Sequence, residues 1–165
     1  MLKKILFIAY PCFSLFAQSP DELYSKAMQD LEVGNLSSAI SSFTSALDMD
    51  PTFAPANIGL ARASVRKGDL KGARENFIAA IEAEPENKDF RSEYEQMSEL
   101  VTLMSKGKRF MQSGDVEQAL ESFRIASEKF PQYPESIFNM GLTYFRKKEF
   151  KEAVGYFNKV LEVNP

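Results

Sequence analysis

The side chains best suited to chemistry in this 165-residue chain are carboxylates placed four residues apart. Glu95 and Glu99 form one such pair, and Glu117 and Glu121 form another. Residues at this spacing share one face of a helix, and two carboxyl groups facing a cleft are the catalytic pair of glycoside hydrolases. On an exposed helix the same spacing produces an ordinary solvated face. We favour this second interpretation over a hydrolytic enzyme.

The composition excludes the other common catalytic and metal-binding arrangements. Histidine is absent and the only cysteine is Cys12, so Ser-His or Cys-His catalysis, the usual zinc sites and an intrachain disulfide are impossible. The eight glycines are scattered and form no phosphate-binding loop. A formal net charge of -3, with no basic cluster, does not suit a nucleic-acid-binding protein. We therefore expect no catalytic residue, metal, cofactor, nucleic acid or small-molecule substrate.

Helices are the elements that must carry any functional surface. Ser19, Pro20 and Glu22 predict a helix start with a capping box, and Gly34 predicts its end. Asn35 is expected to cap a second helix, which ends before Pro51. The apolar residues follow helical spacing in both segments: Leu23, Tyr24, Ala27, Met28 and Leu31, then Leu36, Ala39, Ile40, Phe43, Ala46 and Leu47. One unit is therefore helix, tight turn, helix.

This unit recurs along the chain. The prolines that follow its copies, Pro51, Pro85, Pro131 and Pro165, are 34, 46 and 34 residues apart, so one interval has 12 extra residues. Self-similarity at a period of this length indicates a repeat architecture. A lone helix pair cannot bury its apolar stripe, so stacking of neighbouring units must stabilise the array.

The phase of small, aromatic and proline residues resembles the tetratricopeptide repeat. That family favours Gly or Ala at position 8, Ala at 20 and 27, an aromatic at 24 and Pro at 32; residues 20–53 place Ala27, Ala39, Phe43, Ala46 and Pro51 there. Residues 54–87, 100–133 and 134–165 follow the same pattern. The resemblance implies an all-α, right-handed superhelical solenoid of four helix-turn-helix units with these boundaries.

The resemblance also implies a ligand surface. Positions 2, 5, 9 and 12 of each first helix face a concave groove that usually holds an extended or helical peptide, which makes this chain a non-catalytic scaffold for a protein or peptide partner. The candidate groove residues are Tyr24, Met28, Ile58, Arg62, Met104, Lys108, Phe138 and Leu142. Each of these side chains has an alternative role in packing between units.

Residues 88–99 are the insertion between the second and third units. Their apolar residues continue one helical stripe into the third unit, so we predict a single helix from Lys88 to Ser113, capped by Asn87. We favour a spacer that packs on the second unit. The alternative is a ridge that shapes the groove or contacts a partner.

The last unit has two irregular features. No capping helix follows Pro165, so we expect a partly uncovered stripe made of Val154, Phe157, Val160 and Leu161. Another protomer or a longer natural chain would cover it, and the alternative function is a self-assembling envelope protein that uses this helix as its interface. Lys148 stands where glycine is expected, at a cost of about 1 kcal/mol if it is left-handed.

Residues 1–17 have the pattern of a secretory signal peptide. Lys3 and Lys4 precede an apolar run from Ile5 to Ala17. This run predicts an exported protein of a bacterial periplasm or cell envelope; an uncleaved anchor and a buried helix are the alternatives. Lipidation at Cys12 is not favoured, because Ala9 and Pro11 stand where lipoprotein signals carry an apolar residue such as Leu and a small residue.

Overall fold

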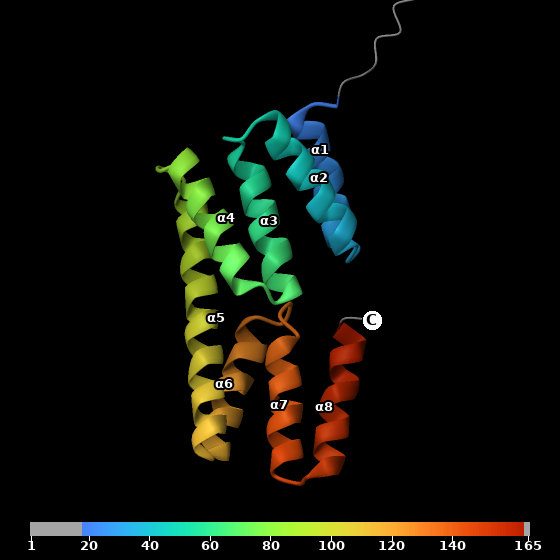
Figure 1. Cartoon of the computed structure of the whole chain (residues 1–165), viewed down its shortest axis with the longest axis vertical. Coiled ribbons are helices and arrows are strands. Elements are labelled where there is room, and N and C mark those ends of the chain that lie inside the picture. Colours follow the sequence, from blue (N-terminus) through green and yellow to red (C-terminus); the bar gives the residue numbers. More distant parts are fainter. Residues whose placement is uncertain (1–17, 164–165) are drawn as a thin grey trace, which may run out of the picture.

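The computed structural model describes residues 18–163 and contains eight α-helices in that range. They are α1 (Pro20–Glu32), α2 (Leu36–Met49), α3 (Ala54–Lys67), α4 (Leu70–Ala83), α5 (Lys88–Ser113), α6 (Val116–Lys129), α7 (Glu135–Arg146) and α8 (Phe150–Val163). Consecutive helices pack in pairs, α1 with α2, α3 with α4, α5 with α6 and α7 with α8 (Figure 1). The described part of the chain is therefore all-α, with four helix-turn-helix units, as predicted. The signal peptide predicted for residues 1–17 and Pro165 lie outside the described residues.

The start of α1 and the start of α5 follow the local sequence. At α1 the backbone N–H of Glu22 donates to Ser19 Oγ and the backbone N–H of Ser19 donates to Glu22 Oε2, each at 3.2 Å, so the predicted capping box is present. Asn87 Oδ1 accepts from the backbone N–H groups of Asp89 and Phe90 at the start of α5. This confirms the predicted cap of the long helix.

The prediction that Asn35 caps α2 is wrong, because its side chain makes no capping hydrogen bond there. At the same repeat position, the carboxylates of Asp69 and Asp115 accept backbone N–H groups of α4 and α6. Asn35 therefore stands at the start of α2 without a capping bond, whereas a side chain caps the second helix of each of the next two units.

Lys148 adopts the left-handed conformation that the repeat frame implies. Its φ is 65°, and it is the only non-glycine residue with positive φ in the described range. The equivalent turns of the first three units contain Gly34, Gly68 and Gly114, with φ between 81° and 84°. A side chain at this backbone angle costs roughly 1–2 kcal/mol, so the last turn is more strained than the other three.

Glycine at repeat position 8 allows a phenylalanine ring to lie against a helix backbone. A Cβ atom on Gly107 of α5 would lie 2.4 Å from Phe123 Cε1, and one on Gly141 of α7 would lie 2.7 Å from Phe157 Cε1. Phe123 is fully buried at this contact. Helix pairs in the third and fourth units therefore approach closely because these positions lack a side chain.

The insertion does not protrude from the molecule. Tyr94 lies edge-on to Phe77 of α4, with ring centroids 6.2 Å apart, and Met97 is buried. The inserted residues thus pack on the second unit, which is the favoured sequence interpretation. Twelve helical residues add about 18 Å, and Figure 1 shows α1–α4 and α6–α8 occupying opposite halves along α5. The four units therefore do not follow one another at a constant step.

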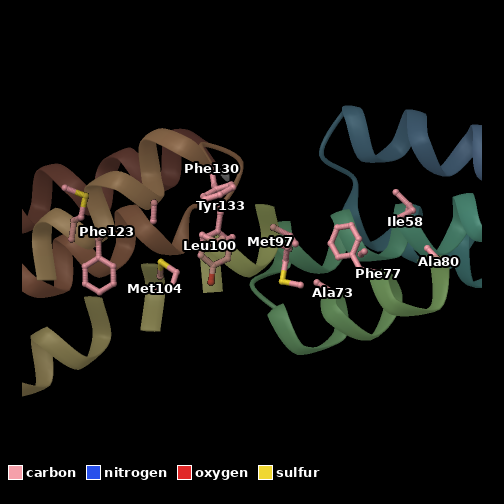
Figure 2. Close-up of a cluster of buried hydrophobic side chains, with 14 of the residues drawn as sticks. Ile58, Ala73, Phe77, Ala80, Met97, Leu100, Met104, Phe123, Phe130 and Tyr133 are labelled. Carbon is pink, nitrogen blue, oxygen red and sulfur yellow. The ribbon is translucent and has the colours of Figure 1, made fainter. Parts of the chain in front are cut away.

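A continuous apolar core runs along one side of this long helix. Met97, Leu100 and Met104 of α5 belong to one cluster with Phe77 of the second unit and Tyr133 before the fourth. Figure 2 shows Met97 between Phe77 on one side and Leu100, Phe130 and Tyr133 on the other. The same helix therefore separates the two halves and connects their cores.

We predict that Gly107→Ala destabilises the protein by about 1–3 kcal/mol, because the added methyl group collides with the buried ring of Phe123. The matched control is Gly155→Ala in α8, where no described atom lies within 4 Å of the added Cβ atom. This control should gain up to about 1 kcal/mol from helix propensity alone. Urea unfolding followed by circular dichroism measures both free energies, and equal stability of the two variants would contradict the close contact.

Candidate functional site

A cavity of about 340 Å³ lies where α3, α5 and the turn between α6 and α7 meet; we call it the junction cavity. Its wall contains five buried apolar side chains: Val65, Phe77, Met97, Leu100 and Phe130. Its more exposed lining is polar: Arg62, Arg66, Glu93, Gln96 and Gln132. Apolar walls with a few polar groups at the opening are the usual composition of a ligand pocket.

The insertion supplies part of this cavity. Glu93, Gln96 and Met97 belong to the twelve inserted residues, whereas Phe130 and Gln132 come from the end of the third unit. A regular array lacks the extra helical turns that carry Glu93, Gln96 and Met97. The insertion therefore packs on the second unit and also supplies part of the cavity wall beside it.

Arg62 lies at this cavity but its charge is already paired. Its Nε donates to Glu93 Oε2 at 2.8 Å and its Nη2 donates to Glu93 Oε1 at 2.5 Å, a two-pronged ion pair between α3 and α5. Hydrogen bonding to Glu93 raises the pKa of Arg62, against the opposing effect of burial. Arg62 therefore fixes the position of the insertion and offers no unpaired charge to a ligand.

A second cavity of about 340 Å³ lies beside the start of α7; we call it the α7 cavity. It is lined by Leu36, Arg66, Lys67, Gly68, Tyr133, Pro134, Glu135, Phe138 and Val160. Arg66 lines both cavities. In the described part of the chain its guanidinium makes one hydrogen bond, from Nη1 to the carbonyl oxygen of Leu31 at the end of α1.

Glu135 in the wall of the α7 cavity accepts two strong hydrogen bonds. Lys108 Nζ donates to its Oε1 at 2.8 Å, and the hydroxyl of Tyr133 donates to its Oε2 at 2.5 Å. Burial raises the pKa of Glu135, but these two hydrogen bonds, the charge of Lys108 and a contribution from Asn139 lower it, and the net effect is a lowered pKa. The pKa of Tyr133 is raised, first by burial and then by its bond to Glu135. Both groups therefore keep their ordinary charge states at neutral pH.

Two of the eight predicted groove residues cannot contact a ligand in this structure. Ile58 and Met104 are each only 2% exposed and belong to the main core cluster, so we remove them from the candidate lining. The extra helical length of α5 and the close stacking of α3 on its neighbours bring these positions into the core. Helical position within the repeat alone could not reveal this.

The other predicted groove residues are dispersed. Tyr24 and Met28 are half-buried against a separate core cluster that α1, α2 and α3 form. The Tyr24 ring lies 5.9 Å from that of Phe43 there. Arg62 lines the junction cavity and Phe138 lines the α7 cavity, whereas Lys108 and Leu142 line neither of the two. Arg62 and Phe138 thus line two different cavities, and these cavities share Arg66 as a lining residue.

Sequence reasoning missed Arg66, Glu93, Gln96 and Gln132. Arg66 follows Arg62 by one helical turn, and this spacing was a usable signal because both side chains then share a face. Gln132 lies 36 residues beyond Gln96 in a turn. Their proximity depends on the path of α5 and has no local signal.

The two carboxylate pairs lie on exposed faces. Glu99 pairs with Lys129, and Arg124 Nη2 lies 2.8 Å from Glu121 Oε1. All four carboxylates are exposed, and neither cavity includes any of them. Within residues 18–163, no group of three or more potential ligands is placed to hold a metal ion, and no helix has the length and apolarity to cross a membrane.

We predict that Lys108→Met makes stability less dependent on pH on the acid side. A carboxyl group with a lowered folded pKa stabilises the protein above its unfolded pKa, about 4.3, and this contribution disappears as the pH falls through the folded value. Without Lys108 the pKa of Glu135 rises, so the variant should lose less stability than the wild type between about pH 6 and pH 3.

Urea unfolding at a series of pH values measures this difference. Lys71→Met is the control, because Lys71 forms only an exposed pair with Glu75, at 3.8 Å. Identical pH profiles for Lys108→Met and the wild type would show that the Lys108 pair does not lower the pKa of Glu135.

Comparison with known proteins gives one family. Tetratricopeptide-repeat family models match residues 30–92 and 134–165. The anaphase-promoting complex subunit CDC16 of Saccharomyces cerevisiae is 26% identical over 160 residues, which are 97% of this chain and 18% of the yeast protein. The photosystem I assembly protein Ycf3 of Synechococcus sp. (strain CC9605) is 35% identical over 88 residues, which are 53% of this chain and 46% of that protein. The chain thus spans less than half of either relative.

Among solved structures, a thermophilic TPR protein of Thermus thermophilus has a TM-score of 0.49 and 21% identity, over 88% of this chain and 74% of that one. Domains of the matched family are generally protein-protein interaction modules and are typically non-catalytic. The two family matches together cover more than half of the 165 residues, and the described helices pack as four helix-turn-helix units. This chain belongs to the tetratricopeptide-repeat family.

Proposed function

We propose that this protein is a non-catalytic scaffold that holds a segment of a partner protein at the junction cavity. The observation that carries the proposal is the cavity of about 340 Å³ between the second and third units, with buried apolar walls and a polar opening. An apolar side chain of a partner removes its surface from water when it enters such a cavity. The junction cavity therefore supplies an anchor point.

The polar opening suits a peptide backbone. Gln96 and Gln132 are exposed at the cavity, and each amide carries both donors and an acceptor. A peptide N–H or C=O that loses water on binding needs such partners. An apolar cavity with amide groups at its opening is thus suited to a protein or peptide segment. The carboxylate pairs lie on exposed faces outside the cavity, which supports a non-catalytic role.

We predict that Gln96→Trp blocks peptide binding. Random linear peptides displayed for selection on the purified protein should yield binders, and Gln96→Trp should weaken their binding by about tenfold or more, because the indole covers the cavity opening. The matched control is Gln112→Trp, since Gln112 is also an exposed glutamine on α5 and does not line the cavity. Calorimetric titration measures both affinities. Equal affinity in the two variants would exclude the junction cavity as the binding site.

The place of action proposed from sequence is the bacterial periplasm or cell envelope. Lys3 and Lys4 followed by the apolar run from Ile5 to Ala17 support export of the chain. The mass of the protein purified from its own cell tests this proposal, because removal of the leader shortens the chain near Ala17. Recovery of the uncut chain would contradict a cleaved signal peptide.

Self-association through α8 is the second candidate function, and the exposure of repeat positions 17, 21 and 28 favours it. In the last unit these are Phe150, Val154 and Leu161, exposed by 55%, 56% and 65%. The same positions of the first unit, Leu36, Ile40 and Leu47, are only partly exposed next to α3. The outer face of α8 thus has the apolar character of a surface that another helix covers.

Two copies would meet α8 against α8. At repeat positions 3 and 10 the second unit has the buried residues Ala56 and Ala63, whereas α1 has Glu22 and Gln29, both exposed. A head-to-tail contact would therefore place polar residues of α1 on the apolar face of α8. A two-fold contact joins the same apolar patch of both copies.

We predict that Leu161→Glu raises the dissociation constant of the α8 dimer by about tenfold or more, because it buries a carboxylate in an apolar contact. Analytical ultracentrifugation over a range of protein concentrations measures this constant. Met49→Glu is the matched control, since Met49 is 52% exposed and lies at the far end of α2. A wild-type protein that stays monomeric at all concentrations would rule out self-association.

A further inference from the structure

The two cavities share an imbalance of charge. Of the charged groups that line them, Glu93 is bonded to Arg62 and Glu135 is bonded to Lys108. The other two lining charges are both cations, Arg66 and Lys67, and neither makes an ion pair with a carboxylate in residues 18–163. Every carboxylate that lines the cavities is therefore already paired, and the two lining groups without an ion pair in residues 18–163 are both positive.

Arg66 occupies the central position in this surface. It lines both cavities, it is partly buried, and its one hydrogen bond to Leu31 leaves further guanidinium N–H groups for a ligand. Guanidinium groups bind carboxylates through paired hydrogen bonds that are stronger than neutral ones. The formal charge of the chain as a whole is -3, so the net charge of the protein does not by itself attract an acidic partner.

We propose that Arg66 binds an acidic side chain of the partner peptide, with one apolar side chain of that peptide in the junction cavity and another in the α7 cavity. This inference rests on the proposed function, because it names the chemistry of the segment held there. Arg66 contributes to the lining of both cavities. A ligand that fills both must therefore pass the guanidinium, where a carboxylate is the favourable group.

The walls of the α7 cavity fit the second apolar side chain. Leu36, Phe138 and Val160 contribute apolar surface from three different helices, and Phe138 is 45% exposed beside the ring of Phe157. Lys67 lies at the same cavity and adds a second positive charge. The acidic residue of the ligand is thus expected between two apolar residues, near Arg66 and Lys67.

Peptide selection on the wild-type protein, followed by a double-mutant cycle that neutralises the charge on the protein and on the peptide, tests this proposal. The selected peptides should carry Asp or Glu between two apolar residues. Arg66→Gln should weaken the binding of an acidic peptide by about tenfold or more, but should change little for the same peptide with Asn or Gln in place of the acid. Arg66→Lys, which keeps the charge, should retain part of the affinity. Arg74→Gln is the matched control, since Arg74 is an exposed arginine of α4 outside both cavities.

The outcomes separate this inference from the proposed function. Suppose that the selected peptides bind the Gln96→Trp variant less tightly than the wild type. If they have no preference for acidic residues, or bind the Arg66→Gln variant as tightly as the wild type, the acidic-ligand inference is overturned and the scaffold proposal stands. Peptides that are insensitive to Gln96→Trp would reject the junction cavity itself. Circular dichroism of Arg66→Gln confirms that the variant is folded, and comparing the acidic and amide peptides on the same variant removes any effect of altered stability.

Discussion

One buried apolar stripe on α5 holds the two halves of the described structure together. A helix pair has too little buried surface to be stable alone, and Met97, Leu100 and Met104 give the second, third and fourth units one shared core. Without the insertion, Met97 would be absent and the two halves would lie closer together. The inserted residues thus set how far apart the halves lie, and the buried stripe joins the halves.

The ion pairs around the cavities have mainly a positioning role. Arg62 and Glu93 connect α3 to the inserted part of α5, and Lys108 and Glu135 connect α5 to α7. The first pair spans the irregular contact that the insertion creates, and the second joins the third unit to the fourth. Partly buried charges are costly unless they are paired. They explain why two cations expected to face a ligand instead bind the protein's own carboxylates. Arg66 and Lys67 are left as the charged groups of this surface that can meet a ligand.

The irregular positions of the repeat generate the candidate surfaces. The regular positions, such as Ala39, Phe43 and Ala46, are fully buried and serve packing alone. The junction cavity requires the twelve inserted residues, and the apolar face of α8 is exposed at repeat positions that are partly covered in the first unit. In a repeat protein, packing constrains the shared residues strongly, so the departures from the pattern are where individual function can arise.

The helices, their pairing into four units and the single long helix from Lys88 to Ser113 were predictable from sequence, because they depend on local spacing, caps and turn residues. The sequence also identified Val154 and Leu161 as part of an uncovered stripe. Which side chains reach a ligand depends on packing over long sequence distances. Ile58 and Met104 lie in the core, Arg62 pairs with Glu93 of the insertion, and Arg66 and Gln132 line one cavity. None of this is visible locally, because an insertion of twelve residues changes how whole units are spaced along a helix and so brings together residues whose separation in sequence carries no pattern.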